Sequence, residues 1–269
     1  MIANIFDTAK NKVGQLELPI HFNEELRLDI ISRAVLAMQA NKRKPYGAYE
    51  EAGKRYSAKL SRRRRNYKTS YGYGISRVPR KILTKRGSRF NWVGALAPGT
   101  VGGRRAHPPK SAKILTKKIN KKEGQKAIRS AIAATMMTDI IKKRGHKLPD
   151  TFPFVMDSSF ELLQKTKDVL RILKTLGFEA ELKMAEAKNV RAGKGKSRAR
   201  KYSKRKSLLI VTGKYGKMTK AAQNIPGVDI VDVKTLNIEL LAPGTKPGRL
   251  TLWTKSAVER LENERLFLT

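Results

Sequence analysis

The segment from Arg62 to Tyr71 combines two side-chain chemistries that act together on nucleic acid. Four consecutive arginines, Arg62–Arg65, precede Tyr67, Lys68 and Tyr71, and six of the eight tyrosines cluster in this basic region. Guanidinium groups pair bidentately with phosphate, while unstacked bases lie against tyrosine rings or guanidinium planes. A solvated, disordered charge run is the alternative, but such runs favour lysine, glutamate and serine. The pattern favours contact with nucleic acid.

Glycine-rich strings lie beside further positive charge in the same region. Tyr71–Gly74 is followed by Arg77 and Arg80, and Gly99–Arg105 ends in two arginines. Glycine accepts positive φ angles and lets a backbone come close to another surface. Simple turns are the alternative, but the adjacent arginines favour close approach to a phosphate backbone.

A second basic string runs from Lys188 to Tyr202. Within it, Gly195-Lys196-Ser197 resembles the end of a nucleotide-binding phosphate loop, as does the later pair Gly216-Lys217. That motif needs a glycine five residues before its Gly-Lys pair. Val190 and Val211 occupy those positions, so nucleotide binding by this motif is excluded.

Few residues are candidates for catalysis or metal binding. The chain has no cysteine, and its three histidines are far apart in the sequence: His21, His107 and His146. Neither a thiolate zinc site nor a His-x-x-x-His site is therefore expected. Asp157 and the pair Asp229 and Asp232 lie at ends of predicted strands, where α/β enzymes place carboxylates. Capping and loop roles explain them equally well, so we predict a protein that is not an enzyme.

The charge balance points to a polyanionic partner. Lysine and arginine number 59 against 22 acidic residues, a net charge of +37 over 269 residues. A compact protein with that charge would repel itself. The charge is concentrated in Asn41–Lys113, with 21 basic and two acidic residues, and in Lys183–Lys206, with 11 basic and one acidic residue. Nucleic acid is the favoured partner, and an anionic membrane surface is the competitor.

No segment is expected to enter a membrane. Met1–Asp7 lacks the basic start and apolar run of a signal peptide. The most apolar stretch, Ala131–Ile141, is interrupted by polar residues and is too short to cross a bilayer. We therefore expect a soluble intracellular protein.

The elements that must position these residues alternate between strand and helix. Asn23 is predicted to cap a helix that ends before Pro45. A second helix is predicted to start near Asn120, whose spacing to Glu123 resembles a capping box, and to run through Met136. The later strands are expected at Phe152–Met156, Glu181–Met184, Leu208–Val211, Asp229–Val233 and Leu250–Trp253. The later helices are expected at Phe160–Leu176, Thr219–Gln223 and Asn237–Leu241. Asp157 or Ser158, together with Glu161, is predicted to cap the helix Phe160–Leu176, and Ser256 with Glu259 to cap a terminal helix.

Short apolar strands separated by helices predict an α/β fold, a three-layer, mostly parallel sheet flanked by helices. We assign residues 1–40 and 114–269 to this globular domain and residues 188–206 to a second basic loop within it. Residues 41–113 lack a sustained period, apart from a weakly helical start near Ala48–Leu60. They predict a long, extended, non-globular loop that is disordered or ordered by a partner.

Four long strings carry a resemblance to a known family: Tyr73–Arg80, Phe90–Pro109, Val190–Arg200 and Asn224–Val228. They resemble the family of the universal ribosomal large-subunit protein four, in its archaeal and eukaryote-like form, over nearly the whole chain. The eukaryotic members carry a long carboxyl-terminal extension, whereas this chain ends at Thr269, which favours the archaeal type. The bacterial members lack the full second basic string, so its role in RNA binding depends mainly on its charge.

The resemblance implies a structural constituent of the large ribosomal subunit in the cytoplasm. Family members bind large-subunit rRNA early in assembly, contact neighbouring ribosomal proteins, and send an extended loop to the polypeptide exit tunnel. The nascent polypeptide would then pass near the loop tip. No membrane contact, no homo-oligomer and no cofactor are expected, with Mg²⁺ or K⁺ present only through the rRNA. A DNA-compacting architectural protein and an RNA-modifying α/β enzyme such as a methyltransferase are the alternatives outside the ribosome.

The candidate site residues fall into two groups. Those expected to bind rRNA are Arg43, Lys44, Arg55, Arg62, Arg63, Arg64, Arg65, Tyr67, Lys68, Arg86, Arg89, Trp92, Arg104, Arg105, His107, Lys110, Arg191, Lys194, Lys196, Arg198, Arg200, Lys201 and Tyr202. Those expected at the tunnel-facing tip, within Tyr71–Lys81, are Tyr71, Gly72, Tyr73, Gly74, Ser76, Arg77, Val78 and Arg80.

Overall fold

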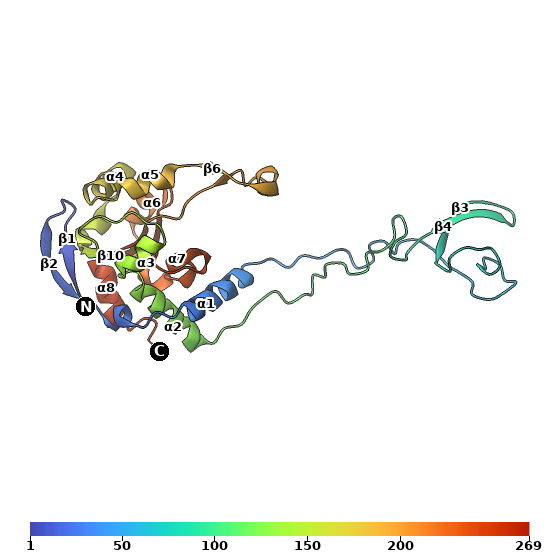
Figure 1. Ribbon diagram of the computed structural model, residues 1–269, viewed down its shortest axis with the longest axis horizontal. Coiled ribbons are helices and arrows are strands. Elements are labelled where there is room, and N and C mark those ends of the chain that lie inside the picture. Colours follow the sequence, from blue (N-terminus) through green and yellow to red (C-terminus); the bar gives the residue numbers. More distant parts are fainter. Residues whose placement is uncertain (269) are drawn as a thin grey trace. The chain divides into compact units, whose positions relative to one another are not determined.

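One six-stranded sheet organises the part of the chain made of Met1–Lys42 and the residues from Lys117 onward. In spatial order its strands are β2 (Lys12–Glu17), β1 (Ile2–Phe6), β5 (Phe154–Met156), β10 (Thr251–Thr254), β8 (Leu209–Thr212) and β9 (Asp229–Asp232). All neighbours run parallel except β1 and β2, which form an antiparallel edge hairpin that the sequence had not predicted. This computed structural model describes residues 1–268 (Figure 1).

The sheet is buried on both faces, which explains its nearly continuous apolar strands. Leu209 and Val211 of β8 point into one core cluster, and Leu208 and Ile210 point into the other. The first cluster is covered by α1 (Leu28–Asn41), α2 (Lys121–Ala133), α7 (Ile238–Leu241) and α8 (Lys255–Asn263). The second is covered by α3 (Thr138–Lys143), α4 (Thr166–Thr175), α5 (Glu179–Glu186) and α6 (Lys217–Gln223). The predicted three-layer, mostly parallel α/β sheet is confirmed.

The first helix begins later than the sequence predicted. Asn23 ends a short 3-10 turn, Ile20–Asn23, and α1 starts at Leu28. The Arg27 amide before the helix donates to Ser130 Oγ of α2 at 2.8 Å. The prediction of an Asn23 cap was wrong because the polar partner at this helix start comes from a distant element.

Three further boundaries differ from prediction. Glu181–Met184, predicted as a strand, lies inside α5, where Leu182 and Ala185 turn to the core while the Glu181 side chain is held by buried polar partners. The terminal helix is capped by Thr254, whose Oγ1 accepts from the Ala257 amide at 3.3 Å, and not by Ser256. The predicted helix Phe160–Leu176 is divided into a 3-10 turn, η2 (Ser158–Leu162), and α4.

The second compact unit is Arg43–Thr116. It holds an antiparallel hairpin, β3 (Arg80–Arg86) and β4 (Arg89–Gly94), so the prediction that this region lacks regular structure was wrong. No helix forms in Ala48–Leu60, where the chain makes turns instead. The hairpin escaped detection because β3 is rich in basic residues and mostly exposed at its end, although Phe90 and Trp92 of β4 alternate with exposed residues.

The second basic loop is itself a small hairpin in the first unit. Strands β6 (Asn189–Val190) and β7 (Tyr202–Ser203) pair antiparallel and enclose a 3-10 turn, η3 (Gly193–Arg198). In residues 1–268, no helix combines the length and the apolar character needed to cross a membrane.

Candidate nucleic-acid interface

The arginine run Arg62–Arg65 forms a closed turn with all four side chains exposed. The Ser61 amide donates to the Lys68 carbonyl at 3.1 Å and the Thr69 amide to the Asn66 carbonyl at 3.1 Å, which ties the base of the turn. Local hydrogen bonds therefore hold the turn while its guanidinium groups face solvent. This arrangement is suited to several phosphate contacts at once.

Tyrosine rings in this unit lie under cationic side chains. The Arg77 guanidinium lies 4.6 Å from the centre of the Tyr71 ring, and Arg64 lies 5.9 Å from the same ring. Lys81 lies 3.9 Å from the Tyr56 ring. A guanidinium stacked on a ring keeps its in-plane N–H donors available for phosphate. The sequence had singled out Tyr71, Arg64 and Arg77 as candidate RNA contacts, whereas Lys81 entered only as the end of the range Tyr71–Lys81 and Tyr56 was not singled out.

Arg80 plays an internal role. It is 9% exposed, donates to the Ser76 carbonyl at 2.5 Å, and lies 5.2 Å from the Trp92 ring. Trp92 packs edge-on against Phe90, which packs in the same way against Tyr67, with centroid distances of 5.0 and 5.4 Å. Arg80 and these rings hold the turn before β3 to the hairpin, so the structure uses them as support.

The end of the β3–β4 hairpin concentrates like charges. Arg86 faces Arg89 across the hairpin, and Lys85 faces Phe90. Like charges directly opposite each other destabilise a strand pair. The described residues of Arg43–Thr116 form no ion pair, although Glu50 and Glu51 belong to the unit. The hairpin end is therefore a surface on which a polyanion would relieve repulsion.

Two chain segments, residues 48–54 and 104–110, lie side by side on the way to and from the β3–β4 hairpin. The Ala48 amide donates to the Pro109 carbonyl at 2.9 Å. Gly53 has a φ of +76°, and a Cβ built on it would lie 2.6 Å from the backbone of Arg104. Only glycine fits there without a shift of the neighbouring backbone.

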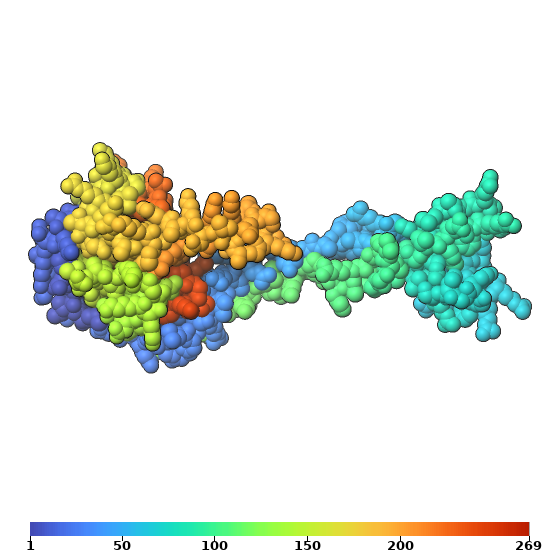
Figure 2. Space-filling view, turned by 45° about the horizontal axis from the view of Figure 1, so that its top comes forward, coloured from blue at the N-terminus to red at the C-terminus, as the bar shows by residue number. Residues whose placement is uncertain are grey.

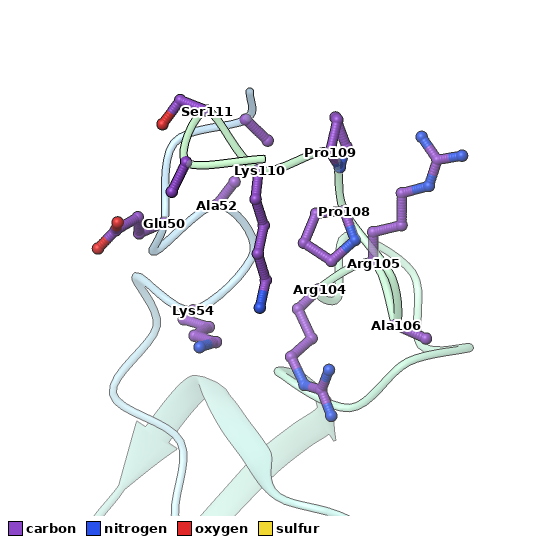
Figure 3. A pocket seen from close by; sticks show the side chains of 12 residues that line it. Glu50, Ala52, Lys54, Arg104, Arg105, Ala106, Pro108, Pro109, Lys110 and Ser111 are labelled. Atoms are coloured by element: carbon purple, nitrogen blue, oxygen red, sulfur yellow. The ribbon is translucent and has the colours of Figure 1, made fainter. Parts of the chain in front are cut away.

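A hollow of about 410 Å³ opens between these segments. Glu50 and Lys54 line it from one segment, and Arg104, Arg105 and Lys110 line it from the other (Figure 3). Four basic residues against one carboxylate give the hollow a positive lining that suits a phosphate. The sequence predicted Arg104 and Lys110 but missed Lys54, whose only signal was its place beside Gly53.

Arg191 organises the second basic loop from within. Its amide donates to the Lys201 carbonyl at 2.8 Å, and its Nε donates to the Arg200 carbonyl at 3.1 Å. The remaining predicted cations of the loop are exposed: Lys194, Lys196, Arg198, Arg200 and Lys201. The loop, coloured orange, stands out from the surface of its unit (Figure 2).

The predicted site residues thus differ in accessibility. Exposed are Arg43, Lys44, Arg55, Arg62–Arg65, Tyr67, Arg86, Arg89, Arg105, His107, Lys110, Arg191, Lys194, Lys196, Arg198, Arg200, Lys201, Tyr202, Gly72, Tyr73, Gly74, Ser76 and Arg77. Partly buried are Lys68, Trp92, Arg104, Tyr71 and Val78, and Arg80 is buried.

The carboxylates at the strand ends have structural partners. Asp157 accepts from the Ser159 amide at 3.1 Å, and hydrogen bonds from Ser159 lower the pKa of Asp157. Asp232 accepts from the Lys234 amide at 3.1 Å and pairs with Arg260. These are capping and ion-pair roles, as the sequence allowed.

Neither a metal site nor a cofactor turn is built at the sheet. In the described chain, no three His, Asp or Glu side chains gather into a metal-binding group. The Gly213 amide, which follows β8, donates to Glu161 Oε1 at 2.9 Å, and a Cβ on Gly213 would lie 2.7 Å from Ser256 Oγ. The strand end that a methyltransferase would need for its cofactor is filled by the protein's own side chains.

Comparison of the sequence with known proteins identifies the family of this chain. Residues 16–264 match the ribosomal protein L4/L1 family. The chain belongs to this family. It is 50% identical to the large ribosomal subunit protein uL4 of Nanoarchaeum equitans over 264 residues, covering 98% of each chain. It is 48% identical to the protein of the same name from Methanococcoides burtonii, over 97% of each chain, and 46% identical to that of Archaeoglobus fulgidus, over 97% of this chain and 98% of the other. The resemblance found in the sequence is confirmed.

Proposed function

We propose that this member of the ribosomal protein L4/L1 family is a non-catalytic, structural constituent of the large ribosomal subunit that binds rRNA through its two basic loops. The observation that carries the proposal is the unpaired positive surface of Arg43–Thr116, where 20 basic residues accompany Glu50 and Glu51. The partners are large-subunit rRNA and neighbouring ribosomal proteins. Mg²⁺ and K⁺ would reach the chain through the RNA, and neither a membrane nor a second copy is needed.

The burial pattern supports a role for RNA in ordering the first loop, residues 41–113. Among the described residues of Arg43–Thr116, Ala95 is the one buried hydrophobic side chain. Ordering a chain costs about 1–2 kcal/mol per residue, and so small an apolar core cannot offset that cost. Phosphate contacts with release of counterions can do so. We propose that the globular unit docks first and that the loop becomes ordered as rRNA folds around it.

The finer assignment concerns the loop tip. We place Tyr71–Lys81 at the wall of the exit tunnel, near the nascent polypeptide, because Tyr73–Arg80 carries part of the family resemblance and the family sends an extended loop to that tunnel. The glycines Gly72 and Gly74 have φ angles of +79° and +63° and open space around them, so they allow the chain to turn sharply without a bulky neighbour. The flanks, including Arg62–Arg65, act as anchors in the RNA.

Co-sedimentation tests the main proposal. The full chain should remain with the large subunit through a high-salt wash, in one copy per subunit. Its release while the other large-subunit proteins stay bound would contradict a constituent role. In a competition at matched salt, rRNA should displace bound rRNA far better than duplex DNA does, whereas equal competition would favour the architectural alternative.

A further inference from the structure

A second cationic pocket lies in the globular unit, at the carboxyl end of the second basic loop, residues 188–206. It has a volume of about 370 Å³ and is lined by Arg144, His146, Arg205, Lys206, Pro243 and Lys246. Arg144 and His146 follow α3, whereas Lys246 follows a 3-10 turn, η5 (Pro243–Thr245), more than a hundred residues later. Folding alone brings these cations together.

Arg144 is held in the pocket by neutral acceptors. Its guanidinium donates to the Pro243 carbonyl at 2.8 Å, to the Pro247 carbonyl at 3.4 Å, and to the Lys246 carbonyl. Among the described residues, neither Arg144 nor Lys246 has a carboxylate partner. Burial, with the nearby charges of Arg249 and Arg205, lowers the pKa of Arg144 to about 10. The protein thus keeps a partly buried cation without compensating it.

The acidic groups next to the pocket are already paired. Glu181 is fully buried, accepts from His146 Nδ1 at 2.8 Å, and lies 3.5 Å from Arg205 Nε. Asp229 pairs with Lys206 at 2.9 Å and with the buried Arg249 at 2.7 Å. Glu181 and Asp229 are thus occupied by Arg205, Lys206, the buried Arg249 and His146. Among the residues that the structure describes, no carboxylate is left to balance the positive charges of Arg144 and Lys246.

His146 adds an unsatisfied polar atom to the same place. Its Nε2 is buried and has no hydrogen-bond partner in the described chain. A buried polar atom without a partner costs about 1–3 kcal/mol. The Glu181 hydrogen bond orients the ring, so the imidazole is held in one position at the pocket.

We propose that this pocket is a binding site for a phosphate group. Arg144 and Lys246 supply the uncompensated charge, and Arg205 and Lys206 supply further donors at its rim. The phosphate is either free inorganic phosphate or a backbone phosphate of RNA. The site goes beyond the proposed function, since Arg144, His146 and Lys246 lie outside both basic loops, although Arg205 and Lys206 belong to the end of the second one, residues 188–206.

The test compares Lys246→Gln and Arg144→Gln with Lys143→Gln in the full chain. Lys143 is exposed on α3 one residue before Arg144 and does not line the pocket, so it is a matched control. Lys246 is exposed, so its replacement leaves the fold intact even if Arg144→Gln does not fold. Each variant is titrated calorimetrically with inorganic phosphate in chloride buffer of constant ionic strength. Each is also bound to large-subunit rRNA over a salt series.

Saturable phosphate binding that weakens on the order of tenfold in Lys246→Gln but not in Lys143→Gln would identify a site for the free ion. Unchanged phosphate binding, with a salt slope for rRNA that is lower by about 0.7–0.9 in Lys246→Gln alone, would identify a backbone phosphate. Lys246→Gln behaving like Lys143→Gln in both titrations would overturn the proposal. That result would leave the role of the first basic loop untouched, because that loop is tested with the Arg62–Arg65 variant.

Discussion

Replacement of Arg62–Arg65 by glutamine removes four exposed guanidinium groups without changing the backbone that holds them. The turn is tied by main-chain hydrogen bonds, and Arg65 has a φ of +56° that glutamine adopts at the same cost as arginine. None of the four forms an ion pair in the described chain. The variant therefore loses charge available to RNA while keeping its fold.

The expected effect follows from counterion release. Each phosphate contact contributes about 0.7–0.9 to the slope of log affinity against log salt, so four contacts contribute about 3. Between 50 and 200 mM salt, a fourfold range, the wild type should lose about 50- to 150-fold more affinity than the variant. Filter binding of the full chain to large-subunit rRNA at several KCl concentrations measures both slopes.

The matched control removes four basic residues from the globular unit. Lys165, Lys167, Arg171 and Lys174 are exposed on or next to α4 and are not among the predicted site residues. Their replacement by glutamine lowers the net charge equally but should leave the slope near the wild-type value. If the Arg62–Arg65 variant keeps the wild-type slope, the arginine turn does not contact phosphate. If both variants lower the slope equally, overall charge explains the binding.

Three further changes probe other parts of the structure. Glu181→Gln should lower the free energy of unfolding by about 3 kcal/mol at neutral pH, because it removes the buried carboxylate that accepts from His146 Nδ1 and pairs with Arg205. Burial raises the pKa of Glu181, but hydrogen bonds from His146 and the Lys147 amide outweigh it and lower the pKa below its ordinary 4.5. The ionised Glu181 carboxylate therefore stabilises the fold above pH 4.5, and this stabilisation is lost as the pH falls through the lower pKa of Glu181 in the folded state. If urea unfolding shows the same difference in stability between wild type and Glu181→Gln at pH 7 and pH 3, this reasoning is wrong. Gly53→Ala should speed hydrogen exchange of the Ala48 amide about tenfold or more, since the new Cβ pushes the paired segments apart; unchanged exchange would show that the close approach is not maintained. Deletion of Tyr71–Lys81 should disturb the passage of nascent chains, followed by ribosome profiling, more than subunit assembly, followed by sedimentation; an assembly defect as large as that of the Arg62–Arg65 variant would count against a tunnel-facing tip.

Local patterns in the sequence were sufficient for much of the sheet. The apolar run Leu208–Val211 predicted a strand buried on both faces, and the structure places β8 there. Asp157 was correctly predicted as a cap, since its side chain accepts from the Ser159 amide. Gly177, with a φ of +96°, follows α4 and ends the predicted helix that runs to Leu176. These features depend on neighbours within a few residues, which sequence patterns describe well.

Elsewhere the prediction failed because the deciding partner is distant in the chain. The start of α1 is supported by Ser130 from α2, so Asn23 had no cap to make. Glu181 lies in a helix because its carboxylate meets His146 and Ser207 in the interior. The strands β2 and β3 are largely exposed, so neither carries the continuous apolar run by which β8 was predicted.

The nucleic-acid chemistry follows from composition alone: arginine with tyrosine and few acids predicts phosphate and base contacts wherever the chain runs. Composition does not reveal which of those arginines are free to bind RNA and which bind other parts of the chain. Arg62–Arg65 are exposed, whereas Arg80 and Arg191 bind backbone carbonyls inside their own loops. The pocket of Arg144 and Lys246 is likewise invisible in the sequence, because its cations meet only through the crossovers of the sheet. Charge is a property of each residue, but whether that charge is already satisfied depends on the partners that the fold brings to it.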